Sequence, residues 1–193
     1  MNYLGKETTF QWLGHATFLV GTPSGRKVLF DPWLGNPSCP EQYQDPEDVD
    51  LILLTHGHSD HIQDVIPQAK KHGCRVVCNV ELAFWLKKLG LPEDQVVEMN
   101  KGGSIEICGL FITMTDAKHS SSIEVDGVLQ YGGEPAGFVV ETENEFRFYY
   151  AGDTCVFSDM ALIGELHAPT LAILPMGDHY TMGPREAAKA AHL

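Results

Sequence analysis

The feature that most constrains this chain is a short apolar segment that runs directly into a histidine-rich loop. Residues 50–54, Asp-Leu-Ile-Leu-Leu, indicate a strand of the kind that is buried on both faces of a sheet. Residues 55–61, Thr-His-Gly-His-Ser-Asp-His, follow without a break. Ligand and catalytic groups of layered α/β folds collect at strand ends. The chain is therefore expected to cover a sheet on both faces and to place a polar site at its edge.

The loop also has the residue types of a metal site. Divalent metals such as zinc bind imidazole and carboxylate ligands in tetrahedral or five-coordinate geometry. His56 and His58 are two residues apart and can point the same way, whereas Asp60 and His61 fall in the first turn of a helix and can reach a neighbouring position. A histidine-rich surface loop is the alternative. Histidine is a rare residue, so three within six positions after a buried strand favour metal binding.

The remaining pattern is a mixture of strands and helices. Further strands are predicted over these ranges: 9–13, 16–20, 27–30, 75–78, 104–107, 110–115, 138–141, 146–150 and 171–174. Helices are predicted at 62–69, at 82–89 and from about residue 181, with Gly73 ending the first. No linker separates the two β-rich halves. We expect one α/β domain over residues 1–193, with two sheets and the helices outside.

Composition limits the classes of partner. The formal net charge of −13 disfavours extended binding to nucleic acid. No apolar run approaches the roughly 20 residues of a membrane helix. The five cysteines are odd in number and scattered, which is typical of reduced cysteines in a cytoplasmic protein. These features predict a cytoplasmic protein with a small-molecule substrate, no nucleic-acid partner and no membrane association, and they leave a homo-oligomer open.

Taken together with five other segments, the loop resembles the signature of the metallo-β-lactamase superfamily. The similarity is closest to the branch of small metal-dependent hydrolases related to ascorbate-6-phosphate lactonases. The other segments are Leu-Gly-His-Ala at 13–16, Leu-Phe-Asp-Pro at 29–32, Ala-Lys-His-Ser at 117–120, Tyr-Ala-Gly-Asp-Thr at 150–154 and Leu-Pro-Met-Gly-Asp at 174–178.

The resemblance implies a four-layer αββα sandwich with metals at one edge between the sheets. It implies His56, His58 and His119 as ligands of a first ion. Asp60 and His61 would bind a second ion, and Asp153 would bridge both. The cofactor is expected to be one or two divalent ions, zinc first, with manganese, nickel and iron also compatible with imidazole and carboxylate ligands.

The resemblance also implies a hydrolase. A metal-activated water would attack a small ester, phosphoester or lactone, and Asp60 would be the catalytic residue, accepting a proton as well as binding metal. Two alternatives are a metal-binding protein without turnover and an RNA-processing nuclease of the same superfamily. The acidic charge argues against the nuclease.

Three residues have roles that the sequence leaves less defined. Asp31, before Pro32, either orients a ligand histidine through its second ring nitrogen or caps a turn. His15 is expected to be a buried structural histidine. His179 follows the 171–174 strand and is a candidate for contact with substrate.

The other polar residues near these segments are given no role in the site. His72, His167 and His192 are expected to be solvated. Glu124, Tyr131 and Glu134 belong to a glycine-bearing region around 127–137, which either covers the site or connects strands.

The family pattern ends with a further strand that carries another histidine ligand of the second ion. The sequence as given stops at Leu193 within a predicted helix. From the sequence we therefore expect the fold to lack its C-terminal strand and the second ion to be held weakly.

Overall fold

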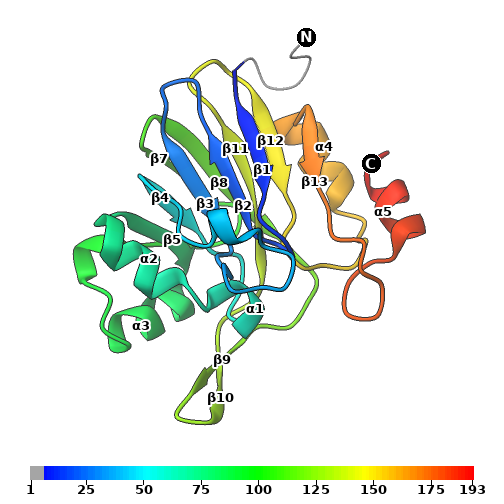
Figure 1. Ribbon diagram of the computed structural model, residues 1–193. Helices are drawn as coiled ribbons and strands as arrows, with labels where there is room; N and C mark the ends of the chain where they lie inside the picture. The colour runs from blue at the N-terminus through cyan, green and yellow to red at the C-terminus, as the bar shows by residue number, and fades with distance from the viewer. Residues whose placement is uncertain (1–6) are drawn as a thin grey trace.

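The chain folds into two sheets that pack face to face (Figure 1). The computed structural model describes residues 7–193. The first sheet has the order β1-β2-β3-β4-β5-β6. Its strands are β1 (Thr9–Trp12), β2 (Phe18–Gly21), β3 (Lys27–Phe30), β4 (Leu51–Leu53), β5 (Arg75–Asn79) and β6 (Val96–Met99). The first two pairings are antiparallel, and those from β3 to β6 are parallel.

The second sheet has the order β13-β12-β11-β8-β7. Its strands are β7 (Ser104–Ile107), β8 (Leu110–Asp116), β11 (Ala136–Glu141), β12 (Arg147–Tyr150) and β13 (Leu171–Ile173). Only the β12–β13 pairing is parallel. The predicted strand at 50–54 thus becomes the central strand β4, and those at 110–115 and 146–150 become β8 and β12.

Alternation along β4 explains why its sequence is apolar throughout. Leu51 and Leu53 belong to the core between the two sheets, whereas Ile52 belongs to the cluster on the opposite face. Successive side chains of a strand point to opposite faces, so a central strand in a layered fold is buried on both. Phe30 and Phe148 add aromatic contacts to the inter-sheet core, with ring centroids 5.9 Å apart.

Helices form the two outer layers (Figure 1). The helices α2 (Val65–His72) and α3 (Val80–Lys88) pack on the outer face of the first sheet. The helix α4 (Met160–His167) packs through Ile163 on the outer face of the second sheet, and α5 (Pro184–Ala190) packs on α4. The predicted αββα sandwich is confirmed. None of the helices within residues 7–193 has the length and hydropathy that crossing a bilayer requires.

The helix predicted at 62–69 is instead two pieces, α1 (Ser59–Ile62) and α2. Asp64 separates them because its backbone leaves the helical region, with φ −103° and ψ 7°. Its side chain accepts a hydrogen bond from the Leu34 amide, at 2.6 Å, and does not cap α2. Gly73 ends α2 in the left-handed region, with φ +63°, as predicted.

The region expected to be a loop around 127–137 begins as a hairpin that projects beyond both sheets (Figure 1). Its strands, β9 (Ser122–Val125) and β10 (Val128–Tyr131), pair only with each other. Asp126 and Gly127 have φ of +52° and +75°, the conformation of a tight two-residue hairpin turn. Two short 3-10 helices, Glu41–Tyr43 and Glu93–Gln95, complete the elements.

Candidate metal centre

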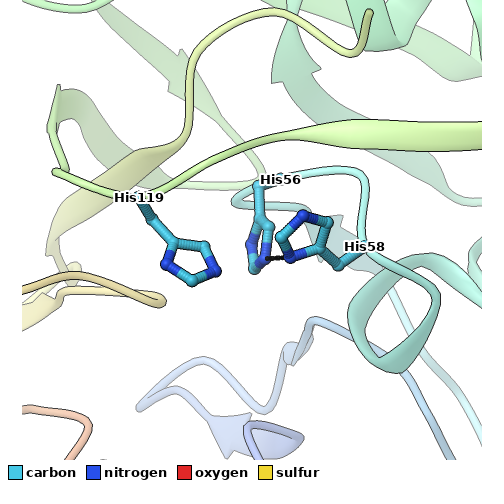
Figure 2. A group of neighbouring side chains, drawn as sticks. All are labelled: His56, His58 and His119. Carbon is cyan, nitrogen blue, oxygen red and sulfur yellow. Dashed lines mark hydrogen bonds between the residues drawn. The ribbon is translucent and has the colours of Figure 1, made fainter. Parts of the chain in front are cut away.

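Three histidines from two distant segments meet at the edge between the sheets. His56 and His58 follow β4, and His119 follows β8. Figure 2 shows their rings turned toward one another, and one ring nitrogen from each lies within 4.8 Å of the other two. Nε2 of His56 is 3.0 Å from Nδ1 of His58. The structure therefore brings these three predicted residues together.

The tautomer of His56 follows from its neighbours. The Thr55 hydroxyl donates to Oδ2 of Asp31 at 2.7 Å, so its oxygen accepts from Nδ1 of His56 at 3.0 Å. Nε2 of His56 is then left with a free lone pair that faces the cluster. Complete burial, together with the adjacent histidines, lowers the pKa of His56 well below 6.5. His56 is thus neutral near pH 7, as a metal ligand must be.

His61 lies beside this group and is held by Asp31. Its Nδ1 is 2.8 Å from Oδ2 of Asp31, and both side chains are fully buried. Its Nε2 is buried and has no hydrogen-bond partner among the described residues. Burial acts to lower the pKa of His61, but Asp31 and Asp153 outweigh it and raise the pKa to about 10. Of the two roles considered for Asp31, contact with a candidate ligand histidine is the one present.

Asp153 lies between His61 and the group formed by His56, His58 and His119. Its Oδ2 is 3.5 Å from Nε2 of His61 and 3.7 Å from Nε2 of His119. Burial would raise the pKa of Asp153, but the close contact with His61 and the attraction of both histidines lower it, so the carboxylate is ionised. The preceding Gly152 has φ +62°, and a Cβ there would lie 2.8 Å from the Thr55 side chain. Only glycine allows this close approach to the loop.

His15 is a residue that the sequence prediction placed wrongly. It was expected to be buried, but its side chain is 39% exposed and its Nε2 lies 2.9 Å from Oδ2 of Asp60. Gly14 and His15 have φ of +90° and +47°, and this turn directs the imidazole outward while Leu13 takes the core position. The hydrogen bond from His15 lowers the pKa of Asp60 to about 2. The Leu-Gly-His-Ala segment indicated the family, but its sequence does not show which of its residues faces the site.

The remaining candidate residues lie apart from these groups. His179 is exposed and packs its ring on Tyr180, with centroids 4.4 Å apart. It is not among the residues that line the adjacent cleft, although its neighbours Asp178, Tyr180 and Thr181 are. The three histidines given no role also lie outside both groups: His72 and His167 are the last residues of α2 and α4, and His192 follows α5.

A cleft of about 1030 Å³ opens over the histidines. His58, Asp60, His119 and Asp153 form part of its lining. The hairpin forms one wall through Glu124 and neighbouring residues. Tyr131 and Glu134 do not line it; Glu134 instead pairs with Lys101 at 2.5 Å. The hairpin therefore borders the site, and the segment after it connects β10 to β11.

These residues fit divalent metal ions on their own chemistry. A buried imidazole nitrogen without a partner, at His61, faces an ionised carboxylate, at Asp153. A second imidazole nitrogen, at His56, carries a free lone pair within reach of two more histidines. Imidazole and carboxylate together suit zinc and other first-row metals. Buried polar groups normally have partners, so the unsatisfied nitrogen of His61 is explained if a metal ion displaces its proton and accepts the lone pair.

Comparison with known proteins gives the family of the chain. The family model described as the β-lactamase superfamily domain matches residues 26–193. A UPF0173 metal-dependent hydrolase of Koribacter versatilis is 51% identical over 183 residues, which cover 94% of this chain and 78% of the relative. Another from Roseiflexus sp. is 46% identical over 197 residues, covering 100% of this chain and 81% of the relative. The chain belongs to the UPF0173 family of metal-dependent hydrolases.

Solved structures give the same fold for this UPF0173 chain. Igni18, a metallo hydrolase from the archaeon Ignicoccus hospitalis, aligns with a TM-score of 0.81 and 33% identity over 95% of this chain and 76% of its own. An isothiocyanate hydrolase from Delia radicum gut bacteria aligns with a TM-score of 0.68 at 20% identity, over 95% of this chain and 79% of its own, a likeness of fold alone. The family resemblance expected from the sequence is confirmed.

Proposed function

We propose that this chain binds one or two divalent metal ions, zinc first, and hydrolyses a small ester, phosphoester or lactone. The observation that carries the proposal is the position of Asp153, whose Oδ2 lies 3.5 Å from His61 and 3.7 Å from His119. A carboxylate between two sets of imidazole nitrogens has the arrangement of a bridging ligand. Manganese, nickel and iron suit the same ligand types.

The ligands divide into two sets. We assign Nε2 of His56, Nδ1 of His58 and a ring nitrogen of His119 to the first ion. Asp60 and Nε2 of His61 are assigned to the second, with Asp153 shared. Divalent metals in such sites lower the pKa of a water molecule toward neutrality and polarise the electrophilic group of the substrate.

Several of the chain's own residues prepare the site for this chemistry. Asp31 holds His61 directly, and it holds His56 through the hydroxyl of Thr55, so both rings keep their free nitrogens toward the site. Ser120 Oγ lies 3.4 Å from Nε2 of His58, which leaves Nδ1 of that ring for the cluster. Ligands with fixed orientation need no rearrangement when the substrate binds.

Asp60 is the proposed catalytic carboxylate. Its side chain is 37% exposed in the cleft wall and, with a pKa of about 2, is ionised at neutral pH. A carboxylate of that pKa is a weak general base. We therefore propose that Asp60 first binds metal and orients the attacking water. It accepts a proton only as the bond to carbon or phosphorus forms. His15 fixes the position of its carboxylate.

A small-molecule substrate fits the dimensions and the charge. A cleft of about 1030 Å³ is of the size that binds small ligands. The net charge of −13 opposes a nucleic-acid backbone.

The test is hydrolysis by the protein after metal removal and after reloading. Chelation should abolish turnover of generic ester, lactone or phosphoester substrates, and zinc, manganese, nickel or iron should restore it. His58→Ala should lower kcat/KM by at least about 100-fold, because a first-ion ligand is lost. His192→Ala, at an exposed histidine outside both groups, is the matched control. Metal binding without any turnover, or cleavage of RNA alone, would contradict the proposal.

A further inference from the structure

We infer that the substrate is a neutral ester or lactone carrying an apolar acyl or alkyl group, and that phosphorylated substrates are excluded. This inference rests on the proposed hydrolase function and narrows it. The basis is the lining of the cleft beyond the candidate ligands, which contains many apolar side chains and two more carboxylates but no lysine or arginine among the described residues.

The apolar lining comes from separate parts of the chain. It includes Phe18, Ile62, Ile123, Leu129, Leu174 and Met176. These residues belong to β2, α1, β9, β10 and the segment after β13, so the fold builds an apolar wall on several sides of the site. Binding an apolar group there removes its surface from water, which favours binding by roughly 25 cal/mol per Å².

The mouth of the cleft is apolar as well. Four large side chains that line it are mostly solvent-exposed: Trp12 at 59%, Leu129 at 70%, Met176 at 59% and Tyr180 at 79%. They come from three segments that are far apart in sequence: β1, β10 and the connection after β13, which holds both Met176 and Tyr180. Isolated exposed apolar residues are ordinary, but several around one cleft mark a binding surface.

Charge completes the argument. Among the described residues that line the cleft there is no lysine or arginine. Besides Asp60 and Asp153, the lining contains the carboxylates of Glu124 and Asp178. Two divalent ions would at most balance these four carboxylates. A phosphate away from the metals would lack the arginine or lysine that usually binds it and would face like charge. A neutral substrate needs no cationic partner and is not repelled by the carboxylates.

The reaction on such a substrate is simple hydrolysis. The oxygen of water bonds to the carbonyl carbon, and the bond from that carbon to the leaving oxygen breaks. One proton of the water passes to the leaving oxygen, and the products are a carboxylic acid and an alcohol, which stay in one molecule when the substrate is a lactone. No oxidant, reductant or further reactant is needed.

The experiment compares substrates on the metal-loaded full chain. We expect kcat/KM to rise at least about tenfold from p-nitrophenyl acetate to p-nitrophenyl hexanoate, since four more methylenes are buried. p-Nitrophenyl phosphate should be at least 100-fold poorer than the hexanoate, on the order expected when a buried charge has no partner.

Two neighbours on β10 provide a matched pair of variants. Leu129→Ser should lower kcat/KM for the hexanoate about fivefold and leave the acetate nearly unchanged. Val128→Ser is the control, because Val128 is also exposed, at 56%, but does not line the cleft. Both side chains are exposed, so neither change should affect folding.

A charge reversal in the lining tests whether the cleft disfavours anionic substrates. Glu124→Lys should raise kcat/KM for the anionic p-nitrophenyl succinate at least about tenfold relative to the neutral p-nitrophenyl butyrate, by replacing repulsion with attraction. Glu106→Lys, at an exposed glutamate of β7 that does not line the cleft, should leave that ratio unchanged.

Titration calorimetry with octanamide and with inorganic phosphate separates this inference from the hydrolase proposal. Binding of octanamide that Leu129→Ser weakens and Val128→Ser does not, without turnover of any ester, lactone or phosphoester, would support the apolar cleft and contradict the hydrolase. Phosphate esters hydrolysed faster than the hexanoate, with no effect of Leu129→Ser, would overturn the inference and leave the hydrolase standing.

Discussion

Nδ1 of His61 lies 2.8 Å from Oδ2 of Asp31, and neither side chain is accessible to solvent. The same carboxylate accepts hydrogen bonds from the backbone amide of Thr55, at 2.8 Å, and from its hydroxyl, at 2.7 Å. The Tyr150 hydroxyl lies 3.0 Å from Oδ2. One buried carboxylate therefore sets the orientation of both His61 and, through Thr55, His56.

Asp31→Asn should weaken both folding and metal binding. An asparagine cannot accept all of these hydrogen bonds, and its amide hydrogens oppose the N–H of His61. We expect zinc affinity to fall about 10- to 100-fold and the free energy of unfolding to fall by roughly 3 kcal/mol. Zinc titration measures the affinity, and urea unfolding measures the free energy of unfolding. Asp45→Asn, in an exposed pair with Lys71, should change neither. Unaltered zinc affinity in Asp31→Asn would show that this contact has no part in the site.

The stability of the metal-free protein should depend on pH through His61. Its pKa of about 10 lies above the ordinary 6.5. Its stabilising contribution is therefore complete below pH 6.5 and is lost as pH rises through 10, with a slope of at most about 1.4 kcal/mol per unit. His56 has a lowered pKa, so its contribution is lost as pH falls below 6.5. Urea unfolding across pH 5–10 should show a maximum near pH 6.5–7.

The variant His61→Gln isolates the alkaline side of that profile. Glutamine can still donate to Asp31 but does not titrate, so the decline between pH 7 and pH 10 should flatten. A decline of equal steepness in His61→Gln would assign it to another group.

His15→Ala should impair activity with little loss of stability. Without the hydrogen bond from His15, the pKa of Asp60 should rise toward its ordinary value and its carboxylate should lose orientation. We expect kcat to fall about tenfold and the free energy of unfolding to change by less than about 0.5 kcal/mol, because the side chain is exposed. His15→Gln should restore part of the activity by keeping an N–H donor. A loss of stability as large as the loss of activity would indicate a structural role instead.

The sequence predicted the layers and the proximity of the loop histidines for identifiable physical reasons. The continuous apolar run of β4 and the spacing of His56, His58, Asp60 and His61 are local signals that the fold preserves. The position of His15 was missed because a turn with two positive φ angles sets it, and apolar periodicity carries no information on such turns. β6 and α4 were missed because tertiary packing on a neighbouring element, more than a local pattern, stabilises them.

Gly152→Ala should disturb the segment that positions Asp153. Gly152 has φ +62°, and the new methyl group would lie 2.8 Å from the Thr55 side chain and 3.0 Å from the carbonyl of Ala136. Gly25→Ala has a φ of +83° but open space around it, so it measures the backbone strain alone. We expect about 1–2 kcal/mol of destabilisation in Gly25→Ala and at least about 2 kcal/mol more in Gly152→Ala. Equal losses in urea unfolding would mean that the close contact is not maintained.

The most direct test of the metal centre is an anomalous difference map from zinc-loaded crystals, recorded at the zinc absorption edge. The account predicts a peak about 2.0–2.1 Å from Nε2 of His56, Nδ1 of His58 and a ring nitrogen of His119. A second peak, if two ions bind, should lie between Asp153, His61 and Asp60. Zinc found only at other positions, or no peak among these three histidines in crystals that contain zinc, would contradict it.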